Sequence, residues 1–167
     1  MNFRKILQNY TRCYNHKKYW KRRFAIYNPN ISRIKKAFYL YYIKRTEGKQ
    51  GAYLGTKTEN GKCNFKDSPI LPHGLIGIVI SAQSIIGSNC QIGHQVTIGR
   101  SKGQSPTIGD NCFIGPGAKI FGGVHIGNNV RIGANCIVCT DIPDNATVVL
   151  DKPRIIIKEE NYKYSIL

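Results

Sequence analysis

An aliphatic residue recurs every six positions through the second half of the chain. The series is Ile80, Ile86, Ile92, Ile98, Ile108, Ile114, Ile120, Ile126, Ile132 and Val138. Glycine follows seven of these ten residues, and a small or β-branched residue usually stands four positions after each. A period of six fits neither an α-helix nor a simple half-buried strand. It predicts a solenoid in which each hexapeptide forms one short strand and one turn, with three hexapeptides closing a triangular coil.

Each hexapeptide position then has an expected role. The β-branched residue points into the prism, the small residue fits the corner, and glycine supplies backbone freedom where the chain turns. Cys90, Cys112 and Cys136 stand at the corner position, and we interpret all six cysteines as small buried residues. Their spacing matches no zinc-site pattern, so no metal site is predicted.

The positive charge is concentrated at the start of the chain. Residues 1–50 hold 14 of the 25 Lys and Arg residues and a single acid, Glu47. We expect two helices there, over about 2–25 and 31–45, followed by a loop at Thr46–Gly51. This basic aromatic segment (1–50) precedes a β-helix domain (51–155) and a tail (156–167).

Three roles are open for the basic segment. It could cap the first coil of the solenoid, or attract an anionic acceptor, glycan or membrane surface. Nucleic-acid binding is the least favoured, because no fold signature for it occurs. No apolar run approaches the about 20 residues that a membrane span needs, and no secretory signal is recognisable. We therefore expect a cytoplasmic protein, with the inner face of the membrane as a second location.

Chemistry is expected where the repeat is interrupted. The first interruption contains His73, which lies between Pro72 and Gly74 just before the regular repeat begins. An imidazole titrates near working pH and could take the proton of an acceptor hydroxyl. His94 lies about one coil later, so it could line an acceptor pocket together with Gln95. A solvated surface position is the alternative for both histidines.

Several stretches resemble the hexapeptide-repeat acyltransferases, in particular the serine acetyltransferase branch and its short relatives associated with surface polysaccharides. The matching stretches are 73–81, 96–99, 106–111, 114–120 and 130–135, with an exit turn at 141–145. The resemblance implies a left-handed parallel β-helix, acetyl-CoA as acyl donor, and a homotrimer with each site between two subunits. It also implies that His73 is the general base.

The chain departs from that branch in three places. The stretch Gln104-Ser105-Pro106-Thr107 lacks the second active-site histidine, which favours a sugar or glycan hydroxyl over free serine as the acceptor. The long helical N-terminal domain is replaced by the basic segment. No clean acidic partner for His73 is found, and Glu59 and Asp67 are the candidates. A noncatalytic scaffold or binding protein acting through residues 1–50 is the alternative from a different class.

The second interruption, Arg100–Ser105, has a composition suited to a coenzyme that carries phosphates: two cations, a glycine and small polar residues. In the family that this chain resembles, such a loop folds over the cofactor. Backbone amides near Gly99, Gly117 and Ala134 are expected to receive the pantetheine arm. The full set of cofactor-binding candidates is Gly99, Arg100, Lys102, Gly117, Ala118, Ala134, Thr140, Lys152, Arg154 and Lys158.

Overall fold

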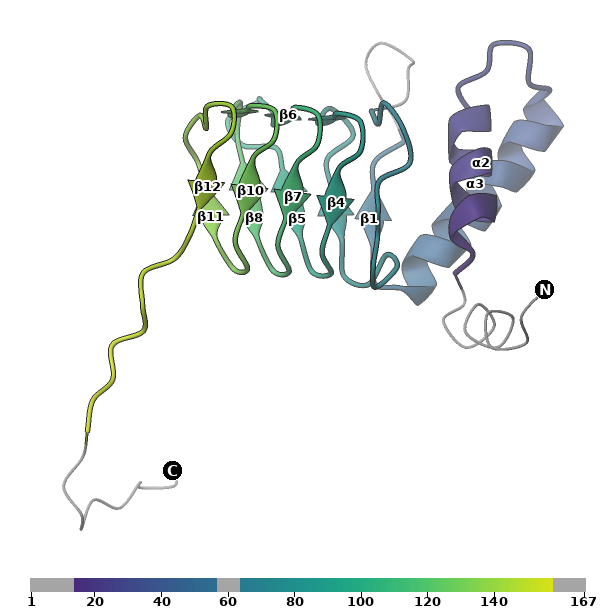
Figure 1. The fold of residues 1–167 in the computed structure, drawn as a ribbon. Helices are drawn as coiled ribbons and strands as arrows, with labels where there is room; N and C mark the ends of the chain where they lie inside the picture. Colours follow the sequence, from purple (N-terminus) through teal and green to yellow (C-terminus); the bar gives the residue numbers. More distant parts are fainter. Residues whose placement is uncertain (1–13, 57–63, 158–167) are drawn as a thin grey trace.

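Over its described residues, the protein is a three-sided parallel β-helix with two helices at one end. The computed structural model describes residues 14–56 and 64–157. Helix α2 spans His16–Ala25 and helix α3 spans Arg33–Lys49. Twelve strands of two or three residues follow: β1 (Tyr53–Leu54), β2 (Val79–Ile80), β3 (Ile85–Ile86), β4 (Gln91–Ile92), β5 (Thr97–Gly99), β6 (Thr107–Ile108), β7 (Phe113–Ile114), β8 (Lys119–Phe121), β9 (His125–Ile126), β10 (Arg131–Ile132), β11 (Ile137–Val138) and β12 (Thr147–Val148). The helices lie at one end of the solenoid, and the chain leaves from the other (Figure 1).

The strands form three parallel sheets, one on each side of the prism. Sheet A has the order β1-β2-β5-β8-β11, sheet B has β3-β6-β9, and sheet C has β12-β10-β7-β4. Each strand pairs with the strand one coil away, as Val79 does with Thr97 and Lys119 with Ile137. The predicted hexapeptide solenoid is therefore confirmed.

The repeating aliphatic residues form the core of the prism. All ten are at most 2% exposed, and the residues at the corner position from Ser84 to Cys136 are also buried. One expectation about the cysteines is wrong, because Cys139 is exposed. It directly follows Val138, at the position where glycine usually stands, and the chain faces outward there. Cys13 and Cys63 lie outside the described residues.

The glycines that follow the aliphatic residues were expected to supply backbone freedom at turns, but they instead allow close packing of neighbouring coils. A Cβ at Gly87 would lie 2.4 Å from the carbonyl oxygen of Gly109 in the next coil, so a larger residue cannot fit between the coils. Of the seven non-glycine residues with left-handed φ in the described part of the chain, five are asparagine. Asn89 and Asn111, for example, have φ of 54° and 59°, and the Asn89 side-chain amide donates to Asn111 Oδ1 at 2.9 Å. Asparagine tolerates this conformation better than most residues.

The N-terminal helices cap the open first coil, as one of the three predicted roles requires. Arg23 on α2 is fully buried and donates to the carbonyl oxygens of Leu54 (3.3 Å) and Gly55 (2.6 Å). Its guanidinium also donates to Asn64 Oδ1 at 3.1 Å and lies 3.5 Å from Glu47 Oε1. Parallel strands at the end of a solenoid present unpaired carbonyls, and the arginine satisfies two of them.

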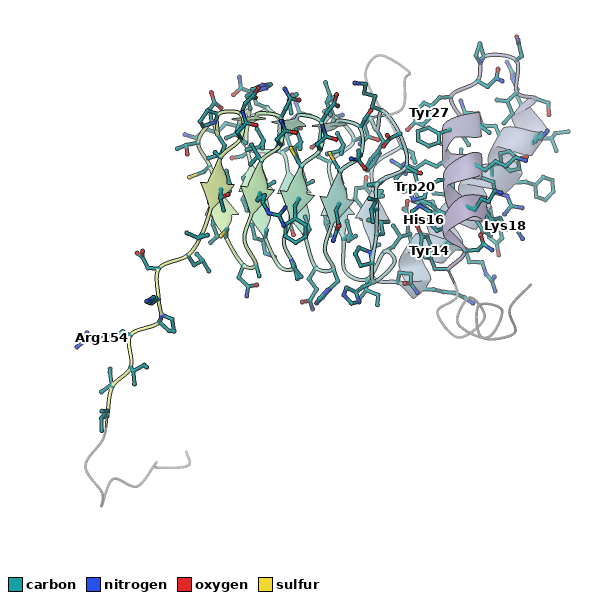
Figure 2. All side chains as sticks on the ribbon, in the orientation of Figure 1. Tyr14, His16, Lys18, Trp20, Tyr27 and Arg154 are labelled. Atoms are coloured by element: carbon teal, nitrogen blue, oxygen red, sulfur yellow. The ribbon has the colours of Figure 1, made fainter. Side chains whose placement is uncertain are left out.

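Aromatic packing completes the cap. The Trp20 ring meets Phe65 of the first coil edge-on, with the centroids 4.8 Å apart. Figure 2 shows Tyr14, His16 and Trp20 on the side of the helical segment nearest the solenoid. Helix α3 ends at Lys49, not at the predicted residue 45, because Thr46 and Glu47 are buried against the rest of the cap and stay helical. Among the described residues, no helix is long and apolar enough to cross a membrane.

Candidate functional site

Two histidines meet at the edge of the prism between sheets C and A, referred to below as the C–A corner. His73 lies in the turn that precedes β2, and His94 lies in the turn between β4 and β5. Their ring centroids are 4.9 Å apart, with an interplanar angle of 84°. The stacking of neighbouring coils thus brings together the two residues that the sequence placed one coil apart. His73 is exposed and His94 is half-buried, so the pair is accessible from solvent.

The inner nitrogen of His94 has an unusual environment. Nδ1 is buried and has no hydrogen-bond partner among the described protein atoms. The backbone of His94 is fixed, because its carbonyl oxygen accepts from the Gly117 N–H at 2.9 Å. Buried polar groups normally have partners, so Nδ1 of His94 is a candidate contact for a ligand.

The corner beneath the histidines is held by a column of left-handed residues. Gly77, Gln95, Gly117 and Asn135 all have φ between 57° and 72°. The Gln95 N–H donates to the Ile76 carbonyl at 2.9 Å, and Lys119 Nζ donates to the carbonyls of Gln95 (3.3 Å) and Gly117 (3.2 Å). The predicted pocket residue Gln95 therefore lies beside His94 and supports the corner. Lys119 was not predicted from the sequence as a site residue, and its ammonium group lies at the C–A corner.

The cap also positions the loop that carries His73. The Gly77 N–H donates to the Gln50 carbonyl at 3.0 Å. A Cβ on Gly74, whose φ is 70°, would lie 3.1 Å from the Tyr14 ring and 3.5 Å from Gln50 Oε1. The residue next to His73 therefore packs on the N-terminal segment. Nothing in the sequence signalled this contact, since Tyr14 and Gln50 lie far from His73 along the chain.

The structure does not bring Asp67 to His73. Asp67 lies at the edge between sheets B and C, where its carboxylate accepts from the Asn89 N–H at 3.1 and 3.3 Å. Asp110 has a similar role two coils later, where it accepts from the Ser88 N–H of the preceding coil at 2.7 Å, and this hydrogen bond lowers the pKa of Asp110. Both acids thus stabilise corner turns. The other candidate acid, Glu59, lies outside the described residues.

A hollow of about 370 Å³ lies along the opposite edge of sheet A, between sheets A and B. It is lined by Tyr53, Val79, Ser81, Ala82, Gln83, Ile98, Gly99 and Arg100. Two of the predicted cofactor-binding residues, Gly99 and Arg100, are therefore in its wall. The mixed lining, apolar along the strands with a cation at the rim, suits an acyl-carrier arm that ends in phosphates.

The inserted loop next to this hollow is a tight hairpin. The Ser101 N–H donates to the Gln104 carbonyl at 2.9 Å, and the Gln104 N–H donates back to Ser101 at 3.0 Å. Lys102 and Gly103 form the turn with φ of 49° and 81°, the pattern of a type I′ turn. Gln104 packs against Gly123 in the next coil, where a Cβ would lie 2.6 Å from Gln104 Oε1. The loop that was expected to fold over the cofactor therefore has a defined shape, with Lys102 exposed at its tip.

The other predicted cofactor residues fall into two places. Gly117, Ala118 and Ala134 continue the C–A corner, but the Gly117 amide is already used by the His94 carbonyl and Ala118 is fully buried. Ala134 is exposed.

The second place is the far end of the solenoid. Thr140 is exposed just after β11, and Lys152 and Arg154 are on the extended chain that leaves the solenoid. Figure 2 shows Arg154 at the end opposite the helices. Within this chain Lys152 and Arg154 do not reach the histidine pair. Lys158 lies outside the described residues.

The parallel coils and the inward column of aliphatic residues define a β-helix of hexapeptide repeats. The histidine pair at the C–A corner is its candidate catalytic site. In agreement, residues 105–140 match the family model described as "Bacterial transferase hexapeptide (six repeats)".

Relatives of this chain include serine acetyltransferases. The serine acetyltransferase of Synechococcus elongatus is 42% identical over 90 residues, which cover 52% of this chain and 36% of the relative. The chain thus spans about a third of that relative's length.

Solved structures agree with this likeness. A serine acetyltransferase from Neisseria gonorrhoeae in complex with serine is 32% identical, with a TM-score of 0.57. The match covers 71% of this chain and 48% of that one. A serine acetyltransferase in complex with CoA is 25% identical, with a TM-score of 0.61, and the match covers 78% of this chain and 51% of that one.

Proposed function

We propose that this protein is an acetyl-CoA-dependent O-acetyltransferase with its reacting centre at His73 and His94. The observation that carries the proposal is the histidine pair itself: the structure brings an exposed imidazole to 4.9 Å from a second one that has an unpaired nitrogen. In the reaction, His73 takes the proton of the acceptor hydroxyl as its oxygen attacks the thioester carbonyl carbon. The carbon–sulfur bond then breaks, and CoA leaves with the proton returned to its sulfur.

His94 is assigned to the acceptor. Its ring meets His73 edge-on, so a hydroxyl held by His94 would be close to the base. Holding the reacting groups together in this way lowers the entropic part of the barrier. The donor is assigned to the hollow along sheet A. Arg100 and Lys102 would bind the phosphates of the coenzyme, while Gly99 and Ser81 lie along the path of its arm.

We favour a small hydroxy amino acid, serine, as the acceptor. The absence of a histidine from the stretch 104–107 favours a sugar or glycan hydroxyl. His94 supplies a second histidine from another part of the chain, which weakens that argument. The relatives named above are serine acetyltransferases, and they support serine over a polysaccharide acceptor.

A trimer is part of this proposal. Within one chain, the histidine pair and the hollow lie on opposite edges of sheet A, so a single copy does not place donor and acceptor together. Neighbouring copies that pack edge to edge could bring the hollow of one chain to the histidines of the next. Exposed apolar residues on sheet A, such as Tyr53 and Ile137, fit a contact between copies.

The function is tested by following the release of free thiol from acetyl-CoA with L-serine and, separately, with a panel of sugars and glycans. We expect release with L-serine that collapses in His73→Ala. Faster release with a sugar would replace serine by the acceptor first inferred from the sequence. Absence of release with every acceptor, together with absence of acetyl-CoA binding, would favour a noncatalytic protein that acts through residues 1–50.

A further inference from the structure

Helix α3 has one face buried against the rest of the protein, and the opposite face has exposed apolar side chains. Ile43, Thr46 and Glu47 are buried on the inner face. On the outer face, Ile34, Phe38 and Tyr41 are 73%, 69% and 68% exposed. Their spacing of four and three residues aligns them in a single stripe along the helix. We call Ile34, Phe38 and Tyr41 the outer stripe.

Cations surround the outer stripe. At 100° per residue, Arg45 continues the stripe toward the C-terminus, while Arg33 flanks it on one side and Lys35 on the other. The only acid of α3 is Glu47, which is buried and paired with Arg23 and Lys44. The outer face therefore has exposed apolar side chains and positive charge, with no exposed acid in the helix.

We propose that the outer face of α3 docks on an anionic lipid surface. A helix with large apolar side chains on one line and Lys or Arg beside them is suited to lie in the plane of a membrane interface. The long basic side chains can lie along the apolar surface and place their charges among the headgroups. Tyr41 has an apolar ring with a polar tip, which fits the same boundary.

A second copy of this chain is a poorer occupant of that face. Two copies meeting through the outer stripe would bring Arg33, Lys35 and Arg45 toward the same cations of the other copy. No acid on the face would offset that repulsion. The excess charge of the segment points the same way, since residues 1–50 have 14 Lys and Arg residues and one acid.

The test is co-sedimentation of the full chain with vesicles. We expect binding to vesicles of phosphatidylglycerol and phosphatidylcholine in equal parts, and little binding to phosphatidylcholine alone. The double variant Ile34→Ser/Phe38→Ser should weaken binding by about tenfold or more. The matched control Val149→Ser/Ile155→Ser removes two apolar residues that are 72% and 84% exposed at the other end of the molecule, and it should bind as the wild type does. Circular dichroism spectra would check that each variant is folded.

A charge pair separates docking from general attraction. Lys35→Gln/Arg45→Gln should weaken vesicle binding more than Lys66→Gln/Arg131→Gln, which removes the same charge from the solenoid. Equal effects of the two pairs, or wild-type binding by Ile34→Ser/Phe38→Ser, would overturn the proposal. So would binding to a soluble anionic glycan that matches vesicle binding and ignores the apolar substitutions, since it would assign the face to a glycan. An oligomer without lipid that the apolar variant abolishes would assign it to a second copy.

Discussion

Removing the Arg23 side chain should destabilise the protein more than any other single change in the cap. Arg23 is 0% exposed, pairs with Glu47 and donates to two carbonyls and one side-chain amide of the first coil. Breaking a buried ion pair by removing one partner costs about 3–5 kcal/mol. For a chain of this size each kcal/mol lowers Tm by about 2–4 °C, so Arg23→Ala should lower Tm by roughly 6–20 °C.

The measurement is thermal unfolding followed by circular dichroism at one protein concentration. Arg22→Ala is the matched control, because Arg22 is adjacent and its guanidinium stacks on Tyr42 at 4.0 Å without capping the coil. The loss of that stacking costs about 0.5–2 kcal/mol. The double variant Arg23→Met/Glu47→Gln should recover part of the loss, since no charge is then left buried alone. Equal Tm values for Arg23→Ala and Arg22→Ala would refute the capping role.

Two further predictions concern a corner and a histidine. Gly117→Ala should lower the free energy of unfolding, measured in urea, by about 1–3 kcal/mol, because φ is 72° and the new Cβ would meet Asn135 Oδ1. The control Gly103→Ala has φ of 81° but open space around the new Cβ, so it should lower the free energy of unfolding by only about 1 kcal/mol. Burial lowers the pKa of His16, whose Nδ1 lies 2.9 Å from the Tyr14 hydroxyl oxygen. The stability that the neutral ring contributes is therefore full above about pH 6.5 and is lost as the pH falls below the ordinary histidine pKa. His16→Gln should reduce that loss in unfolding curves measured between pH 5 and 7.5, and an unchanged pH dependence would contradict the assignment.

The sequence was sufficient for the solenoid because the hexapeptide pattern leaves few alternatives. A residue such as Ile98 must point inward once its neighbours at intervals of six do so, and the coil follows. The position of His94 beside His73 also followed, since residues one coil apart stack. The lengths of the helices did not follow: Thr46 and Glu47 are helical because of burial against α2, which is a tertiary effect.

Other parts of the site depend on contacts that no local pattern encodes. Asp67 was a reasonable candidate acid by its position in the chain, but the fold places it on a different edge, where it stabilises the turn at Asn89. The support of Gly74 by Tyr14 and Gln50 depends on how the helices seat on the first coil. The roles of the glycines depend on the close spacing of the coils, as at Gly87, and sequence alone does not separate that from freedom of the backbone.

The central claim is that His73 is the base of an acetyl transfer. Its most direct test compares acceptor-dependent thiol release from acetyl-CoA in His73→Ala and His125→Ala. His125 is an exposed histidine on β9, away from the pair, and it controls for the loss of an imidazole. We expect His73→Ala to lose about two to four orders of magnitude in kcat with L-serine while His125→Ala keeps the wild-type rate. Equal rates in the two variants would contradict the account.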